Sequence, residues 1–284
     1  MNTQILMLSL LCACLPTIAQ AQPPAVNIST EEQIKEEFTF VPCKNGERLN
    51  AVRALFEKLG APPAEITTDK YKNVENIVVR KQGLTDEVLV VGAHFDKSAD
   101  GCGAIDNWSG IVAVAHLYKT VKDLPTTKTI LFVGFGKEED GLVGSRAMAD
   151  AIPKEQLGKY CAMVNIDSLG LTVPQVADNL SSRKLTDFAV ALAKEMQIQF
   201  AHAAINGAGA DSQSFVNRRI PALTIHGLSS QWPSVLHSSS DQAKKVNTAF
   251  VYLGYRFALA LTARLDEAEC QAVSEQKPKD KGKQ

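Results

Sequence analysis

Short runs of apolar residues recur along the chain and alternate with longer amphipathic stretches. Several runs are apolar at successive positions rather than at every second one, which is typical of strands covered on both faces. The runs that predict strands are 76–80, 87–93, 129–135, 162–166 and 222–225. The stretches that predict helices are 31–38, 48–59, 110–122, 144–151, 184–196 and 241–265.

This alternation predicts an α/β fold, with a mainly parallel (mixed) central sheet and helices on both faces. We see no internal repeat and no interdomain linker, so residues 22–270 are predicted to form a single domain. In such sheets, ligands bind outside the carboxyl ends of the strands. The residues that follow each strand are therefore the first candidates for function.

The two ends of the chain differ from this pattern. Residues 1–21 contain an apolar run followed by "AQA", the small-x-small form of a cleavage site, and they predict a signal peptide. We therefore expect an exported protein, periplasmic or secreted, although "LCAC" resembles a lipoprotein cleavage site. No later stretch reaches the roughly 18 apolar residues of a membrane span, so stable membrane insertion is not expected. Residues 271–284 are predicted to be a disordered basic tail.

Charge and cysteine content narrow the choice of partners and compartment. The formal net charge of -1 gives no reason to expect a nucleic acid as partner. Beyond the signal, four cysteines remain, and an even number in an exported chain permits disulfides. We predict Cys43 with Cys270 and Cys102 with Cys161, and isolated buried thiols are the alternative.

Titratable side chains gather just after the predicted strands and, in the case of Asp106 and His237, just before predicted helices. His94 and Asp96 follow the strand at 87–93, and residues i and i+2 of an extended chain point to the same side, where they can form a carboxylate-histidine pair. Because the carboxyl ends of parallel strands share one edge of a sheet, the other such residues are expected nearby. The full set is His94, Asp96, Asp106, Glu138, Glu139, Asp167 and His237.

Glu138 and Glu139 are adjacent carboxylates directly behind a run that predicts a buried strand. Neighbouring carboxylates repel where water is scarce, so they indicate either a solvated turn or a bound cation. Their place after a buried strand favours the cation. One carboxylate can then bind a metal while its neighbour moves protons, as metal-assisted hydrolysis requires.

The types of residue in this set indicate the metal. Two histidines and several carboxylates without a cysteine suit zinc, and they exceed the three protein ligands of a mononuclear catalytic site. A carboxylate shared by two ions about 3.5 to 4 Å apart would account for the surplus. We therefore predict two Zn²⁺ ions per chain.

Six stretches carry a resemblance to a known family. They are "GAHFD", "GAIDNWSG", "FGKEEDGLVGS", "NIDSLG", "GADSQSF" and "LHSSSDQ". With these stretches, about residues 74 to 262 of the chain resemble the co-catalytic zinc aminopeptidases of metallopeptidase family twenty-eight, a group that contains bacterial leucyl aminopeptidases and, more distantly, glutaminyl cyclases. The resemblance implies the zinc-aminopeptidase (phosphorylase/hydrolase-like) version of the predicted fold.

The resemblance also implies a role for each residue. Asp106 would bridge two zinc ions, with a strained or cis peptide bond after it. Glu138 would be the general base, and Asp96 would lie behind His94 and support catalysis. Asp211 matches a family aspartate, but Ala210 replaces the preceding serine, so only a pocket-shaping role is carried over. The ligands would be His94 and Asp167 at one ion, and Glu139 and His237 at the other.

The function that the resemblance implies is an exported metallo-exopeptidase. It would hydrolyse the N-terminal peptide bond of peptides with a free amino terminus, using a zinc-activated bridging water and Glu138. A glutaminyl cyclase-type acyltransferase is one alternative, although "AIDNWSG" follows the peptidase pattern and Leu236 stands where cyclases tend to carry tryptophan. A carboxypeptidase or dipeptidase on the same centre is another, and a metal-free binding protein is a third.

Specificity and assembly are less accessible from the sequence. Residues 171–183 and 227–236 are predicted to form the pocket walls. The preferred amino-terminal side chain and the oligomeric state cannot be predicted. Five further side chains are assigned to packing, solvent contact or the rim of the cleft rather than to metal: His116, His202, His226, Trp108 and Trp232.

Overall fold

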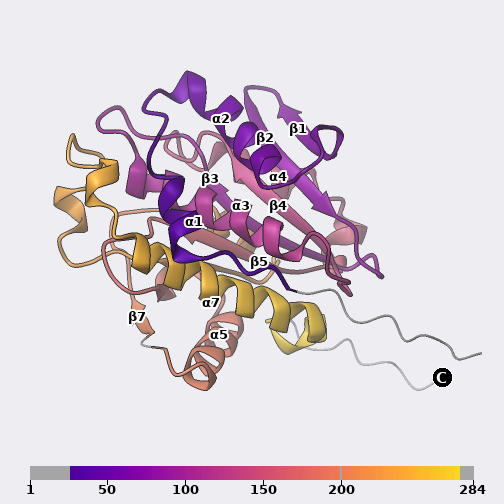
Figure 1. Ribbon diagram of the computed structural model, residues 1–284. Helices are drawn as coiled ribbons and strands as arrows, with labels where there is room; N and C mark the ends of the chain where they lie inside the picture. Colours follow the sequence, from indigo (N-terminus) through magenta and orange to yellow (C-terminus); the bar gives the residue numbers. More distant parts are fainter. Residues whose placement is uncertain (1–25, 199, 276–284) are drawn as a thin grey trace, which may run out of the picture.

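The computed structural model describes residues 26–198 and 200–275 and contains an eight-stranded mixed sheet with helices packed against it (Figure 1). Neighbouring pairs in the centre of the sheet are parallel, and the β1–β2, β2–β4 and β6–β8 pairs are antiparallel. The strands, in spatial order, are β1 (Ile66–Tyr71), β2 (Val74–Lys81), β4 (Thr129–Phe135), β3 (Val88–His94), β5 (Tyr160–Asp167), β8 (Ala222–His226), β6 (Gln175–Ala177) and β7 (Ala201–Ala203).

Helices cover both faces of the sheet. Leu89 and Val91 of β3 belong to one cluster of buried apolar side chains, and Val90 belongs to another. Because successive strand residues point to opposite faces, these clusters lie on opposite sides of the sheet. One side packs against α1 (Glu31–Glu36), α2 (Asn45–Lys58), α3 (Ser109–Val121), α5 (Arg183–Glu195) and α7 (Thr248–Glu267), and the other against α4 (Val143–Ala151) and α6 (Ser212–Val216). Figure 1 shows α3 and α7 side by side.

The central strands bring the candidate residues to one edge of the sheet. Every residue of β3 and β4 is buried, as their continuous apolar runs predict. In the parallel register, His94 at the end of β3 is level with Phe135 at the end of β4. Asp167 at the end of β5 is level with His226 of β8. The loops that leave these strands therefore begin side by side.

The α/β fold class predicted from the sequence is confirmed, but β1, β6, β7 and α6 were not among the predicted elements, and one predicted helix begins later than expected. Residues 241–265 do not form one helix, because α7 begins only at Thr248. The Asp241 side chain accepts two hydrogen bonds from the backbone N–H groups of Ile105 and Asp106, and the Asn247 side chain caps α7. These contacts hold residues 241–247 outside the helix.

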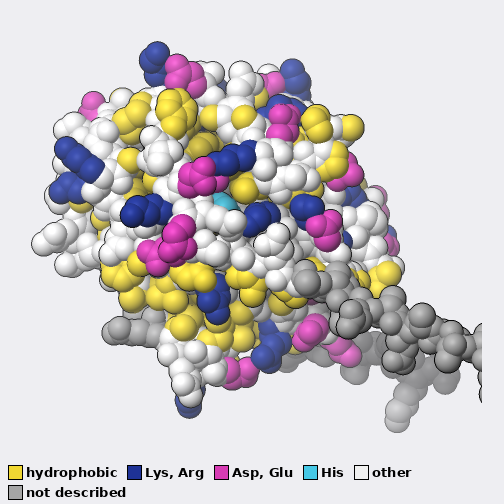
Figure 2. Space-filling model, in the orientation of Figure 1, with side chains coloured by type: hydrophobic (Ala, Val, Ile, Leu, Met, Phe, Trp, Pro, Cys, Tyr) yellow, Lys and Arg dark blue, Asp and Glu magenta, His cyan; other side chains and the backbone are white. Residues whose placement is uncertain are grey.

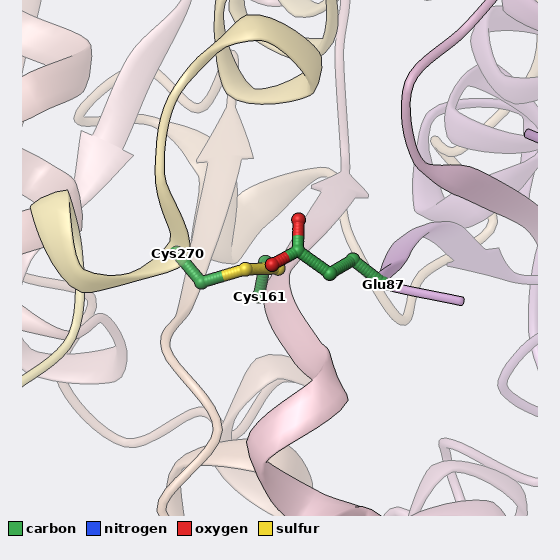
Figure 3. A group of neighbouring side chains, drawn as sticks. All are labelled: Glu87, Cys161 and Cys270. Atoms are coloured by element: carbon green, nitrogen blue, oxygen red, sulfur yellow. A yellow bond between two sulfur atoms is a disulfide. The ribbon is translucent and has the colours of Figure 1, made fainter. Parts of the chain in front are cut away.

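The predicted disulfide pairing is wrong. The structure pairs Cys43 with Cys102 and Cys161 with Cys270, and the Cα atoms are 4.1 and 4.6 Å apart, respectively. Cys43 lies two residues before α2, which packs beside the loop after β3 that carries Cys102. The chain after α7 returns to the start of β5. Figure 3 shows the second disulfide next to Glu87.

The ends of the described chain bear on the predicted domain boundaries. The predicted tail starts at residue 271, but a short 3₁₀-helix covers Cys270–Ala272, and Val273 is buried. Residues 1–21 and 276–284 lie outside the described residues.

Within the described part of the chain, no helix is both long enough and apolar enough to cross a membrane. On the face in Figure 2, acidic and basic side chains are intermixed, in keeping with the small net charge.

Candidate metal centre

Tight turns deliver the candidate residues from the strand ends. His94, the last residue of β3, is fully buried. The chain then turns through left-handed Gly103 into the segment Ala104–Trp108, which carries Asp106 and leads into α3. The peptide bond between Asp106 and Asn107 is cis, in agreement with the resemblance. After β4, α4 begins close against the strand end, since a Cβ atom at Gly144 would collide with the carbonyl oxygen of Gly136.

Asp106 lies at the middle of the cluster. Its Oδ1 atom is 3.1 Å from Nε2 of His94, and its Oδ2 atom is 3.1 Å from Nε2 of His237. The two oxygens of one carboxylate therefore face two different histidines. This is the arrangement required of a carboxylate that is shared by two ions.

Two groups of possible metal ligands meet at this carboxylate. In one group, Nε2 of His94 is also 3.5 Å from Oδ1 of Asp167. In the other, Nε2 of His237 is 3.1 Å from Oε2 of Glu139. Within each group, the possible ligand atoms lie within 4.8 Å of one another. A third group, formed by Glu87 and the two cysteines of Figure 3, has its sulfur atoms joined in a disulfide.

Asp96 connects the ends of β3 and β4. Its carboxylate accepts hydrogen bonds from the backbone N–H groups of Glu138 at 2.9 Å and Glu139 at 3.1 Å. The same carboxylate lies 3.6 Å from Nδ1 of His94, on the opposite side of the ring from Asp106. All residues predicted from the sequence as ligands, base or support are thus brought together.

The electrostatics of the cluster show excess negative charge. Burial, together with the carboxylates of Asp211 and Asp167, raises the pKa of Glu138 to about 10. Burial and the carboxylate of Asp106 raise the pKa of Glu139 to about 7. Although burial opposes its charged form, nearby carboxylates raise the pKa of His94 well above its ordinary value. Without a cation, the cluster therefore retains protons that bound cations would displace.

The donor set fits a pair of zinc ions. It consists of imidazole nitrogens and carboxylate oxygens, which are ordinary zinc ligands. The Oε1 atom of Glu139 is buried without a hydrogen-bond partner. A buried oxygen in that state is costly, and coordination of a cation would offset the cost.

Two supporting residues were missed by sequence reasoning. Asp241 accepts hydrogen bonds from the backbone N–H groups of Ile105 at 2.7 Å and Asp106 at 3.0 Å. The Asn107 side chain donates to the carbonyl oxygen of Ile166 at 2.9 Å and accepts from the backbone N–H of Ser168 at 3.1 Å. The only signal for either was its presence in "LHSSSDQ" or "GAIDNWSG".

A cavity of about 320 Å³ opens over the cluster. Its walls combine the polar cluster with apolar side chains and the loop from Gly207 to Ala210. The apolar wall residues are Leu142, Ile205, Leu228, Trp232 and Leu236. The predicted wall segment 227–236 thus contributes, but 171–183 supplies none of the lining residues. Part of that segment instead forms β6, which pairs with β8 and β7.

The other singled-out residues belong to neither group of possible metal ligands around Asp106. Asp211 is fully buried behind Ala210 of the cavity wall, and burial raises its pKa to about 7. His116 lies 2.8 Å from the hydroxyl of Ser29, and His202 lies 2.9 Å from a carboxylate oxygen of Asp178. His226 accepts a hydrogen bond from the backbone N–H of Leu228, and Trp108 is buried in the core.

Comparison with known proteins places this geometry in a family. A sequence model described as Peptidase family M28 matches residues 76–256. The chain belongs to peptidase family M28. Among curated M28-like relatives, Aminopeptidase YwaD of Bacillus subtilis strain 168 is 30% identical over 127 residues, which are 45% of this chain and 27% of that protein. The match thus spans about a quarter of the relative.

Solved structures share the fold of this chain at low sequence identity. BSAP, a zinc aminopeptidase from Bacillus subtilis, is 20% identical, with a TM-score of 0.61 over 71% of this chain and 53% of that one. The glutaminyl cyclase of an Acidobacteriales bacterium is 17% identical, with a TM-score of 0.71 over 89% of this chain and 99% of that one. At these identities, the likeness bears on the fold alone.

Proposed function

We propose that this M28 chain is a di-zinc aminopeptidase that removes single residues from the free amino ends of peptides. The observation that carries the proposal is the placement of Asp106, whose two carboxylate oxygens each face a different histidine. This carboxylate lines the cavity together with Glu138.

Each ion would have its own set of side chains. His94 and Asp167 would hold one ion, Glu139 and His237 the other, and Asp106 both. When bound, the ions would lower the pKa of a water that they share and polarise the scissile carbonyl group.

Glu138 is proposed as the general base. It lines the cavity but belongs to neither ligand group, and its backbone is held by Asp96. Its carboxylate would take a proton from the attacking water and later donate it to the leaving amine. Burial favours the protonated carboxyl in the metal-free cluster, and two nearby cations would bring its pKa down toward the working range.

The shape of the cavity favours a terminal residue as the bound part of the substrate. Its volume of about 320 Å³ is at the small end of ligand pockets, and its walls beyond the cluster are largely apolar. Such a cavity can hold one apolar side chain, with the free amine near the acidic cluster. A long peptide threaded in both directions would need more space.

A glutaminyl cyclase is the second candidate. The extent of the structural match favours the cyclase. The match covers 99% of the length of the cyclase structure but only 53% of the length of BSAP. The same cluster would then assist attack of the substrate's own amine on its glutaminyl side chain, with release of ammonia. Leu236, which precedes His237 and lines the cavity, supports the peptidase.

One assay separates the two candidates. Purified zinc-loaded protein would be given a panel of aminoacyl-anilides, their amino-blocked versions and a glutaminyl peptide. Cleavage only when the amine is free supports the aminopeptidase. Ammonia release from the glutaminyl peptide without anilide cleavage establishes the cyclase, and cleavage of the amino-blocked anilides would show that the free amine is not required and contradict the aminopeptidase.

We also propose that the chain is exported, with residues 1–21 removed and residues 22–270 forming one catalytic domain. Sequencing the amino terminus of the protein recovered from outside the cytoplasm tests this proposal. An intact amino terminus at Met1 would contradict it.

A further inference from the structure

A buried arginine lies behind the metal centre. Arg48 of α2 is 0% exposed, and among the described residues its guanidinium group donates only to backbone carbonyl oxygens. Nε donates to Pro42 at 3.0 Å, and Nη1 donates to Phe95 at 2.7 Å. Nη2 donates to Cys102 and Gly103, both at 2.7 Å.

Three of these carbonyls, those of Phe95, Cys102 and Gly103, belong to the two segments that present ligands. Phe95 directly follows His94, and Gly103 lies three residues before Asp106. One guanidinium group therefore joins the segment after β3 to the turn that carries the shared carboxylate. Arginine suits this task because its five N–H donors form a rigid fork, whereas lysine offers a single ammonium group.

The Cys43–Cys102 disulfide fastens the same turn. Cys43 follows Pro42, and Cys102 is itself an acceptor of Arg48. Two kinds of link thus hold the turn that precedes Asp106. The disulfide holds it covalently, and Arg48 holds it by hydrogen bonds.

We propose that Arg48, together with the Cys43–Cys102 disulfide, is a positioning device that fixes the separation of His94 from Asp106 and thereby sets how tightly both sites hold zinc. Arg48 touches neither the ions nor the substrate in this proposal. The inference rests on the zinc centre of the proposed function, but not on the identity of the substrate.

The chain offers a matched control for each part of the device. Lys128 is another buried cation that donates to backbone carbonyls, those of Asp266 at 2.9 Å and Ala268 at 2.7 Å. It precedes β4, at the opposite end of the strand from Glu138. The Cys161–Cys270 disulfide likewise lies at the start of β5, away from the ligands.

The test compares zinc affinity with stability in the full chain. Zinc dissociation constants would be measured by competition with a chromogenic chelator, and metal-free melting temperatures by circular dichroism. Arg48→Met is expected to weaken zinc binding by about 10- to 100-fold, the range found for supporting groups around metal sites. Arg48→Lys should give a smaller loss, while Lys128→Met should lower the melting temperature without changing zinc affinity.

The disulfide variants keep the test valid if Arg48→Met does not fold. Replacing Cys43 and Cys102 by serine should weaken zinc binding, and replacing Cys161 and Cys270 should not. If the variants of both regions lose stability alike and keep wild-type zinc affinity, the device is purely structural and the proposal is overturned.

The assay also distinguishes this proposal from the proposed function. A wild-type chain that binds zinc but cleaves no peptide would overturn only the function, because the comparison of zinc affinities would still stand. A wild-type chain that binds no zinc would overturn both.

Discussion

The carboxylate of Asp96 holds the backbone of Glu138, with Oδ1 accepting its N–H at 2.9 Å. The other oxygen accepts the N–H of Glu139 at 3.1 Å. One side chain just after β3 thus fixes two consecutive residues in the loop after β4. The proposed base and one proposed ligand depend on this contact for their relative positions.

Replacement of Asp96 by asparagine tests the importance of this contact. Asparagine has one acceptor oxygen, so one of the two N–H groups would lose its partner, and the charge beside His94 would be lost. We expect kcat/KM to fall by about 10- to 100-fold, as for other groups that support metal ligands. Asp140→Asn is the matched control, because Asp140 is exposed and its carboxylate makes only a long ion pair, with Oδ2 3.9 Å from Nζ of Lys137. Equal losses in both variants would contradict the assignment.

Glu138→Gln separates proton transfer from metal binding. The amide keeps the size of the side chain but cannot accept a proton at neutral pH, so kcat should fall by about 10² or more. Because Glu138 belongs to neither ligand group, zinc content should remain close to that of the wild type. Kinetics together with elemental analysis of the same sample checks both parts. Loss of zinc from this variant would show that Glu138 is a ligand instead.

Replacement of Asp106 and replacement of Asp167 should differ in how many zinc ions the protein retains. Asp106 faces both histidines, so Asp106→Ala should empty both sites. Asp167 faces only His94, so Asp167→Ala should leave one ion in place. Zinc-to-protein ratios after dialysis measure the difference. A stable, active one-zinc form of Asp106→Ala would exclude the shared carboxylate.

Local patterns in the sequence were sufficient to predict the fold class and the residues of the cluster. Continuous apolar runs identify β3 and β4 as buried strands, and parallel topology then brings the residues after them to one edge. The cluster could therefore be assembled from positions along the chain, without distances. That these residues bind zinc stays a prediction.

Features that depend on distant packing could not be predicted in the same way. The disulfide pairing was wrong because it depends on where α2 and the chain after α7 return to the sheet. Arg48 and Asp241 were overlooked because their partners are backbone groups far away in the sequence. Hydrogen bonds to distant backbone groups leave no pattern in the order of residue types along the sequence, so they could not be predicted from it.

Zinc should stabilise the protein more strongly as the pH rises. In the metal-free state, burial raises the pKa of Glu139 to about 7, and a hydrogen bond to Asp106 raises that of His237 to about 9. A group whose pKa is raised by folding contributes stability below its unfolded pKa and loses it as the pH rises through the folded value. The metal-free protein should therefore lose stability as the pH rises from about 4.5 to about 9, with Glu139 responsible up to about pH 7 and His237 from about pH 6.5 upward.

The zinc-loaded protein should not share this loss, because zinc replaces these protons and binds only the deprotonated ligands. Asp106 does not alter this expectation, since its hydrogen bonds with His237 and His94 lower its pKa and confine its effect to acidic solution. Melting temperatures with zinc and with chelator, measured from about pH 6 to about pH 9, should diverge steadily. Asp106→Ala, which is expected to hold neither ion, should show no divergence. A constant difference for the wild type would mean that the protons on Glu139 and His237 do not compete with the metal, and hence that these two residues do not bind it.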